Sequence, residues 1–338
     1  MKTWMLTLLF VIQMVAKARA EETAPIHFNL ITSVDWEGYS LRESDLRPFG
    51  RFRDKNPQIK IVHFLNAAYF TKPGANSSEI QEKIRSVIRP GDEFGLHIHA
   101  FESLLKVAGV RFRESPTFWG DHTSQSINGE RGHDVPLSEF TVDELRKIIR
   151  TSIEILNRNG FENIRSFRAG GWLASPEVLE ALVAEGITID SSAVSTDVVG
   201  LVAGPEMPLY TINKKLWPKQ NPMVHAPYLI DTAAGPILEI PNNIALADYI
   251  DDEEAFELFD KLYTQYLGKQ KVVNFHFGFH QETAAAFLPR VERLLRKIKQ
   301  FQQQYQLSLS SVTFEELKLE DFEATSSKQR ACKRAIRK

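Results

Sequence analysis

Residues 164–192 read IRSFRAGGWLASPEVLEALVAEGITIDSS. The runs 164–168 and 187–191 are short, apolar and rich in β-branched residues, which is typical of strands. Between them, apolar residues recur at three- and four-residue spacing, and Ser175-Pro176 supplies a capping residue followed by proline at the first helical position. This strand, helix and strand succession predicts an α/β fold with a parallel sheet.

The same alternation extends over most of the chain. Further strand-like runs occupy residues 27–34, 59–65, 93–99, 237–240, 272–277 and 307–314. Further helical patterns occupy residues 77–87, 141–157, 251–267 and 284–303. About eight strand signals in roughly 290 residues favour closure into a barrel over an open doubly wound sheet. Residues 101–138 interrupt the alternation, and we interpret them as a loop insertion over the site or an irregular β-excursion.

Composition excludes several classes of protein. The chain has 338 residues, of which 43% are hydrophobic and 25% are charged, as in an ordinary globular protein. The chain has 41 Lys and Arg and 43 Asp and Glu, and its net charge of -2 therefore provides no positive field that would attract nucleic acid. The single cysteine, Cys332, permits neither an intramolecular disulfide nor a thiolate zinc site, so any metal must use histidine and carboxylate ligands.

The two ends of the chain differ from its middle. Lys2 precedes an apolar run over residues 3–16, and Ala18-Arg19-Ala20 resembles a signal-peptidase site. The run is shorter than the roughly 20 residues that span a bilayer, so an uncleaved anchor is the less favoured alternative. We therefore predict a signal peptide over residues 1–20, one domain over residues 21–320 and a basic, disordered tail over residues 321–338. The mature protein is expected in the periplasm or outside the cell, without a stable membrane span.

Residues able to bind metal or to transfer protons end five of the predicted strands. They are, in chain order, Asp35 and Glu37, His97 and His99, Arg168, Asp190, and His276. In a barrel, catalytic groups lie at the carboxyl ends of the strands. Burial of such groups is costly unless they are paired or bound to a metal, so we expect them to share one site.

The His97-x-His99 pair is the most specific metal signal. Residues i and i+2 of a strand point to one face, so two imidazoles can bind one cation. Asp35 and Glu37 have the same spacing, which predicts one metal ligand and one proton acceptor. The alternatives are a hydrogen-bonded core histidine for one of the pair and a solvated turn before Gly38 for the two acids.

Arg168 and His276 complete the candidate set. Arg168 at a strand end needs a carboxylate partner, for which Asp35 is the candidate; a purely structural salt bridge is the alternative. His276 lies between two phenylalanines and is expected to point inward, with a core role or a catalytic one equally open. The other histidines lack a spacing argument: we expect His63, His225 and His280 to be structural or peripheral, and His122 and His133 are weaker candidates for substrate contacts.

Taken in order, these motifs resemble those of the polysaccharide deacetylase (NodB-homology) family. The matching motifs are Asp35-Trp36-Glu37-Gly38, Gly95-Leu96-His97, Phe167-Arg168-Ala169, Asp190-Ser191-Ser192 and Phe275-His276, within about residues 27–315. The resemblance implies a distorted (β/α)7, TIM-like barrel in a single domain. It also implies a divalent metal, usually zinc, and hydrolysis of the N-acetyl group of glycans such as peptidoglycan or chitin oligomers.

Three departures from the family pattern affect the assignment. Trp36 separates the two acids that are usually adjacent, Phe101 stands where the second histidine usually lies, and Gly170 replaces the usual proline. The resemblance then implies these roles: metal ligands Glu37, His97 and His99; general base Asp35, oriented by Arg168; general acid His276; and substrate contacts from Trp36, Trp172 and Asp190.

The expected function is that of an exported, metal-dependent carbohydrate N-deacetylase acting on an N-acetylated glycan. One alternative is a degenerate relative that binds glycan without catalysis. A second is a metal-free barrel glycosidase that uses paired carboxylates such as Glu37 and Glu239.

Overall fold

The structure is a computed structural model that describes residues 26–269 and 272–319. The predicted signal peptide over residues 1–20 and the predicted basic tail over residues 321–338, with Cys332, lie outside the described residues. Within the described ranges, no helix combines the length and the apolar character needed to cross a membrane.

Seven mutually parallel strands form the main sheet. They are β1 (His27–Asp35), β2 (Ile61–Leu65), β3 (Glu93–Ile98), β4 (Ser166–Ala169), β5 (Ile189–Asp190), β7 (Gly235–Glu239) and β8 (Val272–His280). Two more strands join them: β6 (Tyr228–Thr232) lies antiparallel to β7, and β9 (Ser308–Ser311) lies parallel to the first half of β1. In the described part of the chain the spatial order is β6-β7-β5-β4-β3-β2-β1-β8.

An irregular segment, residues 241–247, closes the curled sheet between β7 and β8. The Ile244 N–H donates to the carbonyl of His276 at 3.0 Å, and the Ala247 N–H donates to the carbonyl of Gly278 at 2.8 Å. Only one isolated bridge, Leu246 with Gly278, joins this segment to β8, among the described residues. We call residues 241–247 the seam. The predicted distorted (β/α)7 barrel, in a single α/β domain, is confirmed.

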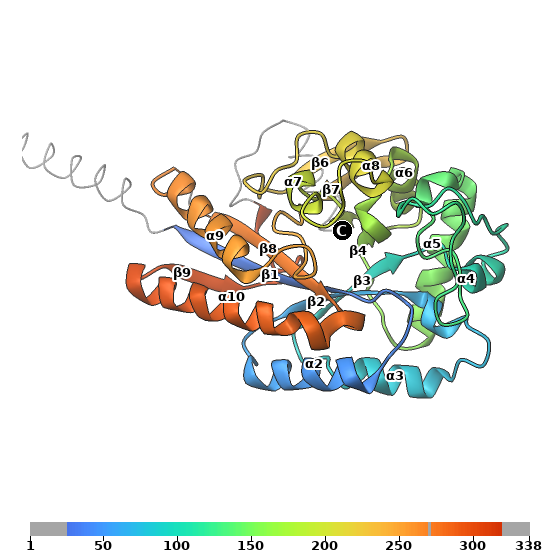
Figure 1. The fold of residues 1–338 in the computed structure, drawn as a ribbon, viewed down its shortest axis with the longest axis horizontal. Coiled ribbons are helices and arrows are strands. Elements are labelled where there is room, and N and C mark those ends of the chain that lie inside the picture. Colours follow the sequence, from blue (N-terminus) through green and yellow to red (C-terminus); the bar gives the residue numbers. More distant parts are fainter. Residues whose placement is uncertain (1–25, 270–271, 320–338) are drawn as a thin grey trace, which may run out of the picture.

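Helices surround the strands, with α10, α2 and α3 on one side of the sheet and α5, α6 and α8 elsewhere around it (Figure 1). Their bounds are α2 (Glu43–Lys55), α3 (Ser77–Arg85), α4 (Glu102–Val107), α5 (Val142–Arg158), α6 (Pro176–Ala184), α7 (Thr196–Val199), α8 (Pro208–Leu216), α9 (Asp252–Tyr266) and α10 (Ala284–Tyr305).

The predicted helices begin where their capping signals lie. Thr141 and Glu144 form a complete capping box at the start of α5, and the Ser175 hydroxyl accepts from the third N–H of α6. Helix α2, which contains Pro48, was not among the predicted helices. Proline inside a helix removes a hydrogen bond, but the packing of α2 against α10 outweighs that cost.

The barrel interior changes from apolar to polar along β1. Inward-facing positions alternate along a strand, and on β1 they are Ile31, Ser33 and Asp35 in that order. Ile31 belongs to a separate apolar cluster inside the barrel, on the side away from the carboxyl ends of the strands. Its other buried members are Val62, Phe64, Ile189, Leu238, Ile240 and Phe314. The polar residues therefore begin at mid-height, and the charged ones meet at the carboxyl ends of the strands.

The interruption at residues 101–138 is a loop insertion. After α4, its only β-pairing among the described residues is the isolated Ile127 and Glu130 bridge. The Phe118 N–H donates to the Asp134 carbonyl at 2.9 Å, and the Leu209 N–H of α8 donates to the Phe118 carbonyl at 2.8 Å. These bonds fasten the insertion to α8 beside the ends of the strands.

Glu93, at the start of β3, makes the stability of the fold depend on pH. Its carboxyl is buried and accepts from the Ser166 hydroxyl at 3.1 Å and the Glu315 N–H at 3.0 Å. Burial raises the pKa of Glu93 to about 7, above its ordinary value of 4.5. The unfolded chain therefore releases this proton first as pH rises, and the contribution of Glu93 to stability falls between these two values.

We expect Glu93→Gln to stabilise the protein at pH 8 by about 1 to 3 kcal/mol, since each pKa unit corresponds to about 1.4 kcal/mol. At pH 4.5 the difference from wild type should nearly disappear. Denaturant unfolding at both pH values measures this difference, with the exposed Glu257→Gln as the control. An equal effect of Glu93→Gln at the two pH values would contradict the prediction.

Candidate metal centre and its pocket

Glu37 follows β1 in a turn that Glu282 holds in place. The Glu282 carboxylate accepts the backbone N–H groups of Glu37 at 3.1 Å and Tyr39 at 3.2 Å. Gly38 between them has a φ of +88°, which a residue with a side chain rarely adopts, and a Cβ there would lie 2.9 Å from Asn66 and Phe101. The turn thus fixes where the Glu37 side chain points.

Glu37, His97 and His99 form a group able to hold a metal ion. Their nearest ligand atoms all lie within 4.8 Å of one another. The Glu37 carboxylate is 3.1 Å from His97 Nε2 and 3.0 Å from His99 Nε2. The structure therefore brings the three predicted metal ligands together from the ends of β1 and β3.

Both histidines have the orientation of metal ligands. His97 Nδ1 donates to the carbonyl of Arg168 at 2.8 Å, and His99 Nδ1 donates to the carbonyl of His133. Each bond leaves the lone pair on Nε2, directed toward Glu37. Apart from its ion-pair contact with Glu37, His99 Nε2 is buried and has no hydrogen-bond partner in the described structure. One carboxylate and two imidazoles with an open position fit the donor set of catalytic zinc.

Charge around Glu37 keeps it ionised. Burial opposes ionisation, but His99, His280 and His97 together hold the pKa of Glu37 well below its ordinary value. The same carboxylate raises the pKa of His99 against the effect of burial. Glu37 is thus available as an anionic ligand.

Asp35 and Arg168 form the expected ion pair, fully inside the barrel. Arg168 Nη1 donates to Asp35 Oδ1 at 2.8 Å and to the Ser33 hydroxyl at 2.8 Å. Its Nε donates to the Ser191 carbonyl at 3.0 Å, and its guanidinium lies 4.4 Å from the Phe64 ring centroid. Because these contacts hold the guanidinium in one position, its bond to Oδ1 fixes the orientation of the Asp35 carboxylate.

His276 does not reach the pocket, contrary to its predicted role as general acid. It is fully buried beside Ser33, with Nδ1 donating to the Pro241 carbonyl at 3.1 Å. Its Nε2 accepts from Arg168 Nη2 at 3.1 Å. Burial and the neighbouring Arg168 lower the pKa of His276 well below its ordinary value, so the ring is neutral, and its one N–H is bonded to the Pro241 carbonyl inside the barrel.

His280, which we expected to be structural or peripheral, lines the pocket instead. It is paired in register with Asp35, two inward-facing positions above His276, and its Nε2 lies 3.4 Å from Glu37 Oε1. Nδ1 donates to the Asp248 carboxylate, which also accepts from the Thr283 hydroxyl at 3.0 Å. Burial opposes the charged ring, but Asp248 and Glu37 raise the pKa of His280 to about 10.

Of the predicted substrate contacts, only Trp172 lines the pocket. Trp36 is fully buried on the other side of the strand, where its Nε1 donates to His63 Nδ1 at 3.2 Å. Asp190 is fully buried and accepts from the Ser192 hydroxyl at 2.7 Å. The predictions for Trp36 and Asp190 are therefore wrong.

Glu239 is also remote from the pocket. It is fully buried, accepts from the Ala193 N–H at 2.9 Å, and has a pKa well above its ordinary value because of burial and the nearby Asp190. The glycosidase alternative needed Glu37 and Glu239 on either side of one bond. The structure does not place them in one pocket, so that alternative lacks its second acid.

The pocket above the metal-binding group has a volume of about 180 Å³. Its polar floor consists of Asp35, Glu37, His97, His99 and His280, and its walls are Tyr39, Phe118, Trp119, His133, Ala169, Gly171, Trp172, Leu246 and Tyr249. Thus His133 of the loop insertion reaches the site, as suggested, while His122 is exposed and does not line it.

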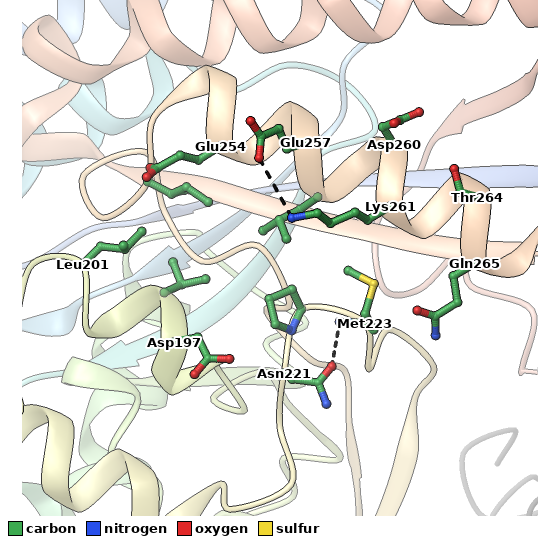
Figure 2. Close-up of a pocket in the computed structure, with 14 residues that line it drawn as sticks. Asp197, Leu201, Asn221, Met223, Glu254, Glu257, Asp260, Lys261, Thr264 and Gln265 are labelled. Carbon is green, nitrogen blue, oxygen red and sulfur yellow. Dashed lines mark hydrogen bonds and ion pairs between the residues drawn. The ribbon is translucent and has the colours of Figure 1, made fainter.

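A larger hollow of about 760 Å³ lies between α7 and α9. Figure 2 shows Glu254, Glu257 and Asp260 of α9 on one side of it and Asp197 of α7 on the other. It contains none of the residues that the motifs identified, so the smaller pocket is the candidate active site.

Gly170 gives the His99 ring its space. A Cβ at position 170 would lie 2.5 Å from His99 Cε1 and 2.6 Å from Nδ1. We expect Gly170→Ala to displace the imidazole and to weaken metal binding at least tenfold, the size of effect seen when the support of a ligand is lost. Competition with a chromophoric chelator measures the affinity. Gly50→Ala in α2, where a Cβ meets nothing within 4 Å, is the control; equal affinity in both variants would contradict the prediction.

No family model and no curated protein matches this sequence. Similar solved structures include a Mycobacterium smegmatis protein described as a polysaccharide deacetylase, with 14% identity, TM-score 0.44, and 87% of this chain and 98% of that chain covered. A family 4 carbohydrate esterase from Streptomyces lividans has 9% identity, TM-score 0.38, and coverages of 84% and 91%. Puue allantoinase has 13% identity, TM-score 0.48, and coverages of 90% and 92%.

Proposed function

We propose that this chain is a metal-dependent hydrolase that removes acetyl groups from N-acetylated carbohydrate. One observation supports this most strongly: the Glu37, His97 and His99 group shares a pocket with Asp35, which is paired with Arg168, and with His280, which is paired with Asp248. A site for a cation, a proton acceptor and a proton donor together provide the groups that amide hydrolysis needs.

Glu37, His97 and His99 would hold the metal, for which we propose Zn²⁺. When bound, such an ion lowers the pKa of a water molecule and polarises the acyl carbonyl. The hydrogen bonds from the histidine Nδ1 atoms to backbone carbonyls keep both Nε2 atoms directed at this position.

Asp35 is the proposed general base. Arg168 holds its Oδ1 at 2.8 Å and stabilises the ionised carboxylate inside the barrel. Asp35 also lines the pocket, so it can take the proton of the attacking water.

His280 replaces His276 as the proposed general acid. Asp248 stabilises the protonated ring, and Nε2 faces the pocket beside Glu37. An amine is a poor leaving group until it is protonated, so transfer of the Nε2 proton to the amide nitrogen would complete cleavage of the C–N bond.

The substrate assignment rests on the pocket walls and on the motif resemblance. Phe118, Trp119, Trp172 and Tyr249 offer apolar ring faces and edges above the polar floor, as a carbohydrate face requires. We propose an acetylated amino sugar of peptidoglycan or a chitin-like glycan. The sequence of residues 1–20 leads us to propose that the protein acts outside the cytoplasm.

The test is acetate release from N-acetylated chito-oligosaccharides by the zinc-loaded protein. We expect acetate and free amines in equal amounts, with no new reducing ends. New reducing ends would instead indicate a glycosidase. Stoichiometric zinc without either product would indicate a glycan-binding relative that lacks catalysis.

A further inference from the structure

We propose that the pocket accepts a single acetylated sugar unit end-on, so that the substrate is a free acetylated amino sugar or the terminal unit of a short chain. This inference rests on the proposed function and narrows its substrate class. The interior of a polymer would need a groove open at two ends, and the following contacts close this pocket on three sides.

The size of the pocket sets the first limit. Its volume of about 180 Å³ is below the roughly 300 to 1,000 Å³ of pockets that enclose drug-sized ligands. The five polar residues of the floor occupy its base, so the acetamido group must enter deepest for its carbonyl to reach them. The remaining space then suits the ring that bears this group.

The first wall is a locked assembly of the loop insertion, α8 and the turn after β4. The Phe118 carbonyl accepts from the Leu209 N–H at 2.8 Å, and Asn213 Nδ2 donates to the Gly171 carbonyl at 2.9 Å. Trp217 Nε1 donates to the Trp172 carbonyl at 2.9 Å. A Cβ at Gly171 would lie 3.0 Å from Leu209 and 3.5 Å from Phe118, so this wall is also closely packed.

The second wall is Tyr249, which comes just after the seam in the chain. Tyr249 packs edge-on against Trp172, with ring centroids 4.9 Å apart, and lies 6.4 Å from the His280 ring. Its segment is fastened to β8 through the Ala247 N–H and Gly278 carbonyl bond. Trp172 thus joins the first wall to the second.

The third wall is Tyr39, which packs edge-on against Phe101 and His133 with ring centroids 5.5 Å and 5.3 Å apart. Lys72 Nζ donates to the Tyr39 carbonyl at 2.6 Å and holds the turn. Tyr39, Trp119 and Tyr249 are the partly buried aromatic residues of the lining, whereas Phe118 and Trp172 are fully buried, so the first three form the mouth.

The experiment compares N-acetylglucosamine and its β-1,4-linked oligomers of two, four and six units. We expect kcat/KM per chain to change less than threefold from two to six units, and mass spectrometric sequencing to find the free amine at one chain end only. Deacetylation of internal units, or a rise in kcat/KM of tenfold or more with length, would overturn the proposal.

A variant of the mouth tests the same walls. We expect Trp119→Ala to permit deacetylation of internal units of the hexamer, while Tyr305→Ala, an exposed aromatic residue on α10, retains the end-only pattern. An end-only pattern in Trp119→Ala as well would mean that the mouth does not limit access, and it would overturn the proposal that these side chains restrict the pocket to one unit.

Failure of the deacetylase proposal gives a different result. If the zinc-loaded protein releases no acetate from any length, titration calorimetry with the same sugars tests the pocket alone. Equal affinities for the dimer and the hexamer support a one-unit pocket. Tighter binding of the hexamer, or no binding of either sugar, overturns it.

Discussion

His97→Ala and His99→Ala proteins should each lose stoichiometric metal and, with it, all but a trace of acetate release. Each imidazole is one of the three proposed protein ligands, and its Nε2 lies about 3 Å from the Glu37 carboxylate. Loss of a ligand's supporting hydrogen bond alone typically costs 10- to 100-fold in metal affinity, so loss of the ligand itself should cost at least 100-fold.

Elemental analysis after dialysis, together with chelator competition, measures this loss. His122→Ala is the matched control, because that histidine is exposed and does not line the pocket. We expect about one zinc per chain in wild type and in the control. Stoichiometric zinc in His97→Ala, with normal turnover, would refute the assignment of the metal centre.

His280→Ala should retain metal yet lose about 10²- to 10⁴-fold in kcat for N-acetyl sugars, the usual range for loss of a general acid. The reason is the leaving group: an amine must gain a proton as the C–N bond breaks, and His280 supported by Asp248 is the proposed donor. His276 cannot substitute, since both of its ring nitrogens are already hydrogen-bonded inside the barrel.

An ester with a good leaving group separates this role from a general disturbance of the site. p-Nitrophenolate leaves without protonation, so His280→Ala should hydrolyse p-nitrophenyl acetate within about fivefold of the wild-type rate. Equal losses on the ester and on the amide would show that His280 acts through the metal centre or the pocket shape. Normal amide hydrolysis would remove it from the mechanism.

The sequence predicted most of the candidate metal centre because its residues lie at the ends of parallel strands. Glu37, His97 and His99 come from β1 and β3, two strands whose carboxyl ends must share one edge of the sheet. The Arg168 and Asp35 pair was predicted for two reasons. Both residues lie at the carboxyl ends of parallel strands, and a buried guanidinium without a carboxylate partner would be costly.

The choice between His276 and His280 depended on a register that the sequence did not reveal. Both are on one face of β8, four residues apart, so alternation cannot separate them. Pairing of Ile31 with His276 and of Asp35 with His280 places the first beside the apolar interior and the second at the pocket. The position of Trp36 was predictable. Because Asp35 and Glu37 face the site, alternation turns the residue between them to the outer face of the barrel wall, where Trp36 is buried against Phe49 of α2.

No sequence motif predicted the supporting contacts from Glu282, Asp248 and the carbonyl of His133. They support the site from the turn after β8, the segment before α9 and the loop insertion, and each contact joins parts of the chain at least 32 residues apart. Such contacts depend on how loops fold over the barrel, which strand and helix periodicity does not describe.

The seam is a part of the barrel wall with low local stability, and it lies next to the pocket. Elsewhere the barrel wall is a continuous ladder, whereas residues 241–247 reach β8 through a few separate hydrogen bonds. Regions with few such bonds open at lower free energy than the rest of a domain. Asp248 and Tyr249 directly follow this segment, so local opening there would withdraw the partner of His280 and one wall of the pocket together. Heat inactivation of this protein would then precede its global unfolding.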